Sequence, residues 1–472
     1  MPLPMSPITP LPPIDRAQAS AALSRLGVKA VECALGDFTS LARGKRVNRE
    51  DFLSLGGCKL PSVILGLTLT AGEPDEVFGP MLPTSYIDMH LVPDLATLAP
   101  RPGRPGEATV LCEPTGRWWS EHHGREIDAS ELSPRAALRR VIAGFESQGL
   151  QALVAPELEL FLLHREEADG RVHLGSARGH KGALAREGAC EAFSLERAGH
   201  FEAYFDELYA ACEAMAIPLS GHAHESALSQ YEVNFRPGAP LAQADAVFRF
   251  KRVAREIAAR HGFLASFAAK PFLDQPGTGM HWHFSVQRRA AAGEWPHLFA
   301  HASGDSSDQL GHFVAGLQTH TPAAMAFFAP YDMAYDRIAL SDASPSHSSW
   351  GPEDRSFAFR IPSSGPQARR VENRLPGGDA NPYLTVAATL GLGLAGLAAA
   401  QAPHPGADDA HALPRTLPAA LDALTASPML RELFGAPLVD AFVAIKRHEH
   451  AERAKLADPR HQWDLTHLIE LA

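Results

Sequence analysis

The sequence predicts a protein of two domains built from both strands and helices, and three observations lead to this prediction. The chain has 472 residues, more than one hydrophobic core usually supports. Residues 28–95 carry short strand and turn signals, as in "VKAVECALGDF" and "IDMHLVPD". From residue 133 onward, helical and strand patterns alternate. The polar stretch 120–131 marks the expected boundary, so we place the domains at 25–127 and 128–472.

The first 24 residues are expected to form a flexible tail. The segment "MPLPMSPITPLPPIDR" is rich in proline and has neither the basic start nor the apolar stretch of a signal peptide. Further along, the Gly/Pro/Arg-rich segment 99–107 predicts a loop.

The clearest helix is predicted over 133–149. Ser133 suits the N-cap, Pro134 suits the first helical position, and Gly149 closes the helix. Its apolar face consists of Leu138, Val141, Ile142 and Phe145. Further helices are predicted over 199–216, 240–261, 306–328 and 383–400.

The composition of the chain indicates which kinds of partner it binds and in which compartment it is found. The run 384–400, "LTVAATLGLGLAGLAAA", is nearly apolar enough to span a membrane, but its Ala, Gly and Thr content predicts a buried helix. The 43 Lys+Arg against 54 Asp+Glu give a net charge of −11, which disfavours binding to nucleic acid or anionic lipid. The five cysteines are widely spaced and form no C-x-x-C pair, as in reduced cytoplasmic proteins.

The histidines at 122–123 and the run "KRHEHAERAK" are expected on a solvated surface.

The segment "PELELF" places two carboxylates inside an apolar run. Side chains alternate along a strand, so Glu157 and Glu159 share one face while Leu158 and Leu160 share the other. Taken alone, this alternation is more often a solvated face of a sheet than a metal site.

The same pattern recurs in three further segments, and this favours polar faces that line one cavity. These faces hold Glu225, Glu232 and Asn234 in "HESALSQYEVNF", His281, His283 and Ser285 in "GTGMHWHFSV", and Arg370, Glu372 and Arg374 in "RRVENRL". Glutamates with a histidine suit two Mg²⁺ or Mn²⁺ ions better than structural zinc. Several arginines in the same cavity indicate a ligand whose negative charge is spread over several oxygens, typically a nucleoside triphosphate. The sequence has neither a P-loop nor a G-x-G-x-x-G motif, so the nucleotide would be bound without either loop.

From about residue 28 to its end, the chain resembles the glutamine synthetase superfamily. The segment "DFTSLARGK" (37–45) is similar to the start of its small β-grasp domain. Five segments follow the order of its catalytic signatures: "PELELF", "HES…QYEVNF", "GTGMHWHFS", "WGPEDRSFAFRIP" and "RRVENRLPGGDANPYL". The stretches "GAPLAQADAVFRFKR" and "GLQTHTPAAMAFFAPY" are most similar to γ-glutamylpolyamine synthetases.

This resemblance implies an α+β fold, in which a small N-terminal β-grasp domain precedes a catalytic domain. The catalytic domain would be a half-barrel of curved antiparallel sheet with surrounding helices. The resemblance also implies a homo-dodecamer of two hexameric rings.

The resemblance further implies a reaction: an ATP-dependent ligase joins the γ-carboxylate of glutamate to an amine through γ-glutamyl phosphate. Two to three Mg²⁺ or Mn²⁺ ions would assist. Glu159, Glu225 and Glu232 match the ligands of a first metal, and Glu157, His281 and Glu372 match those of a second. His283, Ser285, Arg360 and Arg370 match nucleotide contacts; Arg355 and Arg360 match catalytic arginines; Arg337, Arg374 and Gly277 match glutamate contacts.

Several residues differ from the family pattern at positions that concern the amine substrate or the acid substrate. The small domain has no Asp-Gly-Ser, and Ala343 stands where ammonia-using members have a flap glutamate, which favours an organic amine over ammonia. The neighbouring Asp342 is an alternative source of that charge. Asp336, Asp354 and Pro276 also replace family residues, so an ammonia-dependent glutamine synthetase, an altered acid substrate and a protein without catalysis remain alternatives.

Overall fold

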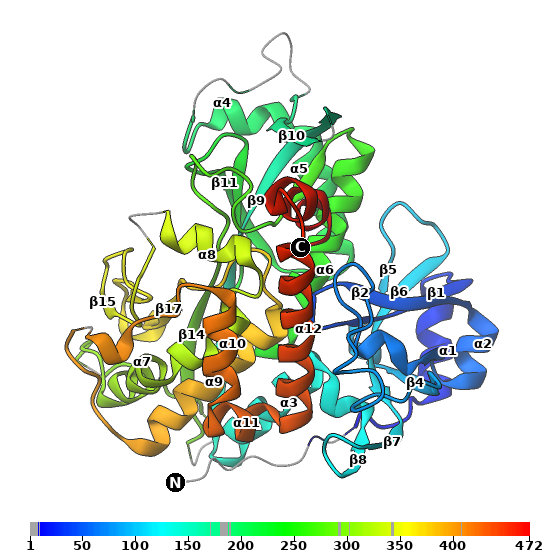
Figure 1. Ribbon diagram of the computed structural model, residues 1–472, viewed down its shortest axis with the longest axis horizontal. Helices are drawn as coiled ribbons and strands as arrows, with labels where there is room; N and C mark the ends of the chain where they lie inside the picture. Colours follow the sequence, from blue (N-terminus) through cyan, green and yellow to red (C-terminus); the bar gives the residue numbers. More distant parts are fainter. Residues whose placement is uncertain are drawn as a thin grey trace.

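The computed structural model describes residues 8, 10–169, 171–179, 187, 190–290, 294–301, 303–340, 344–406 and 408–472. Its fold is α+β, with two large β-sheets, a separate two-stranded hairpin and surrounding helices (Figure 1). The smaller sheet comes first in the chain, and the larger sheet holds the polar-faced strands.

The smaller sheet has the strand order β2-β1-β6-β4-β3, with β5 added beside β6. Its strands are β1 (Ala30–Gly36), β2 (Ala42–Asn48), β3 (Cys58–Pro61), β4 (Asp88–Pro93), β5 (Ala99–Pro100) and β6 (Glu107–Thr115). β1 and β6 are parallel, whereas the other pairs are antiparallel. Helices α1 (Arg16–Arg25) and α2 (Arg49–Leu55) and the 3₁₀ turns η1 (Ser62–Leu65) and η2 (Leu95–Thr97) accompany it.

The predicted flexible tail is wrong for residues 16–24, which belong to α1. Asp15 caps this helix, because its Oδ1 accepts hydrogen bonds from the backbone N–H groups of Ala17 and Gln18. Ala19 and Leu23 are fully buried. One apolar stripe at helical spacing is therefore enough to hold this segment against the hydrophobic core.

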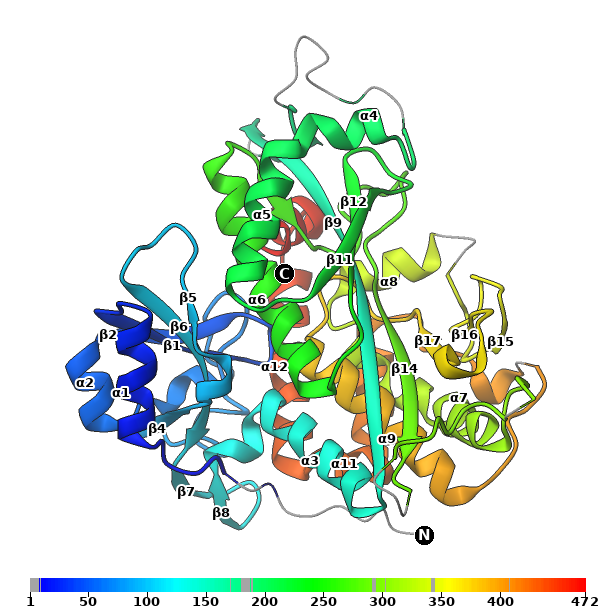
Figure 2. The same cartoon turned by 180° about the vertical axis from the view of Figure 1, so that it is seen from behind.

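The larger sheet has the order β11-β12-β9-β14-β17-β16-β15, with β10 and β13 also paired to β9. Its strands are β9 (Leu150–Ala168), β10 (Arg171–Ser176), β11 (Leu219–His224), β12 (Gln230–Phe235), β13 (Leu264–Ser266), β14 (Met280–Arg288), β15 (Trp350–Pro352), β16 (Phe359–Ile361) and β17 (Val371–Asn373). All pairs are antiparallel except β15 with β16. β9 and β14 run side by side through its centre (Figure 2).

Helices cover the apolar face of this sheet and complete the C-terminal half. They are α3 (Pro134–Ser147), α4 (Leu195–Ala198), α5 (Glu202–Ala214), α6 (Pro240–Arg260), α7 (Asp308–Phe328), α8 (Asp332–Ala339), α9 (Pro382–Ala399), α10 (Leu417–Thr425), α11 (Pro428–Phe434), α12 (Ala436–Ala454) and α13 (Ile469–Leu471). Shorter turns are η3 (Ala129–Leu132), η4 (Gly199–Phe201), η5 (Pro366–Ala368) and η6 (Asp409–His411), and η7 (Arg460–Leu468) is a π-helix. The hairpin β7 (Arg117–Ser120) and β8 (Arg125–Asp128) stands apart from both sheets.

The predicted helices are confirmed, with small shifts at their ends. α3 begins as expected: Ser133 accepts a hydrogen bond from the Ala136 N–H, and Pro134 is the first helical residue. Among the described residues, α9 is the one helix long and apolar enough to cross a membrane, and 78% of it is buried inside the protein. The predicted boundary after residue 127 falls within β8, and the division into two domains remains a prediction.

One buried arginine joins the smaller sheet to the helices of the larger one. Arg135, on α3, donates to both carboxylate oxygens of Asp245 on α6, each at 2.9 Å. It also donates to Glu113 of β6 at 2.9 Å and to Asp94, after β4, at 2.6 Å. Tyr383 of α9 completes the network with a 2.8 Å hydrogen bond to Asp245.

Replacing this arginine should weaken the whole structure. In Arg135→Met the carboxylate of Asp245 would stay buried without this cation and Glu113 would keep only Arg139, which costs about 3–5 kcal/mol of unfolding free energy. Arg117→Met, at a 71% exposed side chain, is the control and should cost less than about 1 kcal/mol. Urea unfolding measures both, and equal stability of the two variants would contradict the role of Arg135.

Candidate active site

The register of the larger sheet gathers the predicted polar residues at one place. Within β9, Glu157 and Glu159 alternate with the fully buried Leu158 and Leu160. On one side β12 pairs Glu232 with Glu159. On the other side, β14 pairs His281 with Glu157. In the next two strand pairs, His283 of β14 lies opposite Glu372 of β17, and Glu372 lies opposite Arg360 of β16.

Two histidines bring Glu157 and Glu372 together. His283 Nδ1 accepts a hydrogen bond from Arg370 Nε at 3.2 Å. Nε2 therefore carries the proton of the neutral ring and donates to Glu157 Oε1 at 2.8 Å. Nδ1 of His281 lies 3.9 Å from Glu157 Oε2 and 3.7 Å from Glu372 Oε1. Donor atoms of Glu157, His283 and Glu372 thus lie within 4.8 Å of one another, as do those of Glu157, Glu232 and His281.

Arginines surround the fully buried carboxylate of Glu372. Arg360 Nη1 donates to it at 2.7 Å, and Arg374 Nη1 donates to its other oxygen. Burial alone would raise the pKa of Glu372, but His281, Arg374, His283 and Arg360 outweigh this effect and lower it. Burial likewise opposes the ionisation of Glu157, yet His281 and His283 hold its pKa far below the usual range. This half of the site is compensated by the protein's own positive and hydrogen-bonding groups.

The other half of the site lacks such compensation. Burial raises the pKa of Glu159 to about 7, and the charges of Glu225 and Glu232 add to the effect, while Arg337 and the Gly279 N–H oppose it. Burial also raises the pKa of Glu232 to about 7, helped by Glu157 and Glu225 and opposed by Asn234 and Arg355. These carboxylates repel one another and would be stabilised by a cation.

Two glycines let the backbone approach the site. A Cβ at Gly279 would lie 2.4 Å from Nε2 of His281, and the Gly279 N–H donates to Glu159 at 2.7 Å. A Cβ at Gly277 would lie 2.2 Å from the backbone oxygen of Ala269 and 3.0 Å from Cγ of Arg337. The contact between Gly277 and Arg337 agrees with their expected proximity.

The predicted substrate arginines are partly engaged by the backbone. Arg337 donates to the carbonyl oxygens of Leu375 at 2.8 Å and Arg374 at 3.1 Å. Arg374 Nε donates to the Arg355 carbonyl at 3.0 Å. A guanidinium has five N–H donors, so both groups retain donors for a ligand.

The structure brings together four of the six predicted metal ligands in the two donor groups, namely Glu157, Glu232, His281 and Glu372, and adds His283. Glu159 and Glu225 belong to neither group among the described residues. Glu225 follows β11, and its carboxylate accepts from the N–H and Oγ of Ser226. Ser285 lies on β14 opposite Leu153, on the same face as His283.

The residues that differ from the family pattern have different surroundings. Asp336, beside Arg337, lies 3.8 Å from Arg460. Asp354 accepts a 2.8 Å hydrogen bond from the Ser356 N–H and so closes the turn around Arg355. Pro276 is exposed. Asp342 and Ala343 lie outside the described residues.

The sequence reasoning missed Gln230 and Gly279. Gln230 of β12 donates to Glu159 at 3.1 Å and to the Gly277 carbonyl at 3.0 Å, so it links two predicted positions. Gln230 and Glu232 both lie in "QYEVNF", after the segment that contains Glu225. Nothing in the periodicity distinguishes Gln230 from an ordinary strand residue.

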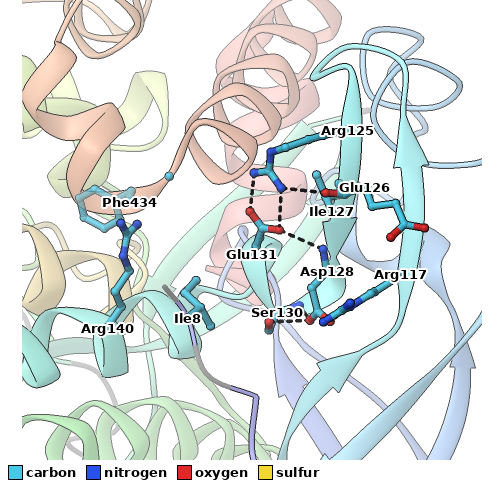
Figure 3. A pocket seen from close by; sticks show the side chains of 11 residues that line it. Ile8, Arg117, Arg125, Glu126, Ile127, Asp128, Ser130, Glu131, Arg140 and Phe434 are labelled. Atoms are coloured by element: carbon cyan, nitrogen blue, oxygen red, sulfur yellow. Dashed lines mark hydrogen bonds and ion pairs between the residues drawn. The ribbon is translucent and has the colours of Figure 1, made fainter. Parts of the chain in front are cut away.

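A cavity of about 630 Å³ lies elsewhere, along the β7–β8 hairpin, η3, α3 and the residues joining α11 to α12 (Figure 3). Its charged side chains pair within the protein, with Arg125 2.6 Å from Glu131 and Arg117 3.5 Å from Asp128. None of the predicted site residues lines it.

The donor set at β9 fits divalent metal ions. Carboxylate oxygens with one or two imidazoles suit Mg²⁺ or Mn²⁺. The raised pKa values of Glu159 and Glu232 show where positive charge would stabilise the site. Glu157 contributes to both donor groups and would help to hold an ion at either of them.

Comparison with known families agrees with this geometry. The model of the glutamine synthetase catalytic domain matches residues 131–467, the greater part of the chain. The chain belongs to the glutamine synthetase family. The matched segment contains the larger sheet and every predicted site residue.

Relatives within this family include ligases for organic amines. The chain is 30% identical to the gamma-glutamylputrescine synthetase PuuA of Escherichia coli over 361 residues, which cover 76% of this chain and 73% of PuuA. It is also 30% identical to a glutamate–isopropylamine ligase of a Pseudomonas species over 368 residues, 76% of each chain. Glutamine synthetases match at 28–32% identity. A structure of GmaS with ADP has a TM-score of 0.74 and 26% identity, covering 93% of this chain and 96% of that one.

Metal affinity should rise with pH. The pKa values of Glu159 and Glu232 lie near 7 in the folded chain, above their usual 4.5. Between these values the folded chain holds more protons than the unfolded chain, so metal-free stability falls as pH rises. An ion must displace up to about two protons from these carboxylates. Mn²⁺ titrations should therefore show tighter binding as pH rises through about 7; a flat profile would contradict these raised pKa values.

Proposed function

We propose that this ligase of the glutamine synthetase family joins the γ-carboxylate of glutamate to an organic amine, with ATP as the phosphate donor. The observation that carries the proposal is the register of five neighbouring strands. It pairs Glu232 with Glu159, His281 with Glu157, His283 with Glu372, and Arg360 with Glu372. Carboxylates for metal ions and guanidinium groups for phosphate are what phosphoryl transfer to a carboxylate requires.

The chain's own residues would hold the reactants in line. Arg360, Arg370, His283 and Ser285 would contact the nucleotide, and Arg337 and Arg374 would bind glutamate next to Gly277. Bound Mg²⁺ or Mn²⁺ ions would neutralise both the triphosphate and the glutamates of β9. A γ-carboxylate oxygen of glutamate attacks the γ-phosphorus of ATP, which forms γ-glutamyl phosphate and releases ADP. Arg355 and Arg360 would stabilise the charge on the phosphoryl group during transfer.

The amine then attacks the acyl carbon of γ-glutamyl phosphate. The carbon–nitrogen bond forms, the bond to the phosphate oxygen breaks, and the amine loses one proton as inorganic phosphate leaves. Because the reactants are held together, this second step is effectively unimolecular.

Two observations favour an organic amine over ammonia. The small domain lacks an Asp-Gly-Ser segment and position 343 is alanine, so two carboxylates that would hold ammonium are missing. PuuA and the glutamate–isopropylamine ligase are also named for organic amines. Ammonia-dependent glutamine synthesis is the second candidate, since glutamine synthetases match at 28–32% identity.

Phosphate release from ATP, with Mg²⁺ and glutamate, tests this proposal across ammonia, putrescine, spermidine, ethanolamine and simple monoamines. We expect release with at least one organic amine and little with ammonia, and mass spectrometry should detect the matching γ-glutamyl amide. Preference for ammonia would support the second candidate instead. The absence of phosphate release with every amine tested would contradict glutamate–amine ligation. It would indicate an altered acid substrate, and Asp336 would be the first position to examine.

Glu159→Gln separates metal binding from folding. Glutamine has the shape of the protonated acid and can still accept from Gln230 and Gly279, so metal-free stability should be unchanged or higher. Turnover should fall at least about 100-fold, because one ligand charge is lost. Glu166→Gln, at a 62% exposed side chain on the same strand, is the matched control. Full activity of Glu159→Gln would contradict a metal role for this carboxylate.

A further inference from the structure

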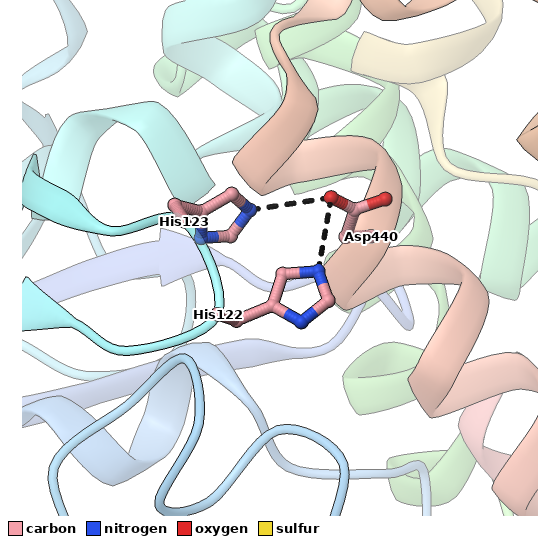
Figure 4. Close-up of side chains that lie close together, drawn as sticks. All are labelled: His122, His123 and Asp440. Atoms are coloured by element: carbon pink, nitrogen blue, oxygen red, sulfur yellow. Dashed lines mark hydrogen bonds and ion pairs between the residues drawn. The ribbon is translucent and has the colours of Figure 1, made fainter.

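A histidine pair outside the site described above meets a carboxylate from another part of the chain (Figure 4). His122 and His123 lie in the turn between β7 and β8, and Asp440 lies on α12. Nε2 of His122 is 3.4 Å, and Nε2 of His123 is 3.2 Å, from the same oxygen, Oδ2 of Asp440. The expectation of a solvated surface here is wrong for His123, whose side chain is only 8% exposed.

Ser120 and Asp440 hold the His123 ring between them. The Ser120 hydroxyl lies 2.9 Å from Nδ1 of His123 and 3.2 Å from the Pro80 carbonyl oxygen. On the other side of the ring, Nε2 lies 3.2 Å from the Asp440 oxygen. The ring is therefore fixed with Nε2 directed at the carboxylate.

We propose that His122, His123 and Asp440 bind one divalent transition-metal ion of the zinc type. Zinc bonds to nitrogen and oxygen of about 2.0–2.2 Å in a tetrahedron place neighbouring donor atoms about 3.4 Å apart. The observed separations of 3.4 and 3.2 Å match this spacing, and all three donor atoms lie within 4.8 Å of one another. The side chain of His122 is 44% exposed, which leaves the fourth position to water.

The residues around these three ligands support the same assignment. Ser120 orients His123 through the ring nitrogen that does not face the ion, as outer partners of metal-bound histidines commonly do. Arg431 donates to both oxygens of Asp440, with Nη2 3.0 Å from Oδ2, and so fixes the carboxylate. Two imidazoles favour zinc over Mg²⁺, in contrast to the glutamate-rich site on β9.

The proposed ion would link the β7–β8 hairpin to α12. Farther along α12, Glu449 accepts a 2.6 Å hydrogen bond from the Leu69 N–H, so this helix already contacts a second N-terminal segment. An ion that binds only the folded chain raises its stability by mass action. Zinc should therefore stabilise this contact without entering the β9 site.

Zinc binding in an excess of Mg²⁺ tests the proposal with the full chain. Wild type should bind one more Zn²⁺ per chain than His122→Gln or His123→Gln, and Zn²⁺ should raise the melting temperature of wild type more than that of either variant. His173→Gln, at an exposed residue of β10, is the matched control. Zinc bound elsewhere, as at His404, Asp408 and His411, cancels in the comparison.

Ser120→Ala tests the orienting role separately. It removes no ligand atom, yet zinc affinity at this site should fall about 10–100-fold. Equal zinc stoichiometry and equal zinc-induced stabilisation in wild type and both histidine variants would overturn the proposal. In that case the contact between His123 and Asp440 is an ordinary hydrogen bond within the protein.

Discussion

The structure depends on the burial of carboxylates around β9: Glu157 and Glu159 lie on one face of this strand, and Glu232 and Glu372 lie on strands nearby. A buried carboxylate is expensive unless a positive charge or several hydrogen bonds accompany it. The apolar face of the same strand, with Leu158 and Leu160, is packed into the core and fixes which side chains turn toward the site. A shift of register by one residue would move the glutamates into the core. Core packing and site geometry are therefore set by the same alternation.

The compensation is unequal across the site. Around Glu157 and Glu372, histidines and arginines lower the pKa values and leave both groups ionised. Around Glu159 and Glu232, burial and mutual repulsion raise them to about 7. The first half is organised before any ligand arrives, which is the arrangement that makes electrostatic stabilisation of a phosphoryl group effective. The second half would be stabilised by a bound cation, which would couple metal binding to the charge state of the site.

Part of this could be predicted from the sequence because strand periodicity is local. The alternation in "PELELF" and "GTGMHWHFSV" identified the shared faces of Glu157 with Glu159 and of His281 with His283, and cap residues identified α3. Contacts between distant strands were not predictable from periodicity. Nothing local indicates that His283 donates to Glu157, or that Gln230 reaches Glu159. The early helix α1 was missed because the prolines before it obscured an apolar stripe made of only Ala19 and Leu23.

Anomalous diffraction from Mn²⁺-soaked crystals tests the central claim most directly, because it locates each ion relative to its ligands. The account predicts two ions on the carboxylate face of β9, with Glu157 next to both, one toward Glu159 and Glu232 and the other toward Glu372. Ions bound elsewhere, with no density beside Glu157, would contradict the claim that metal charge compensates the buried carboxylates of this strand.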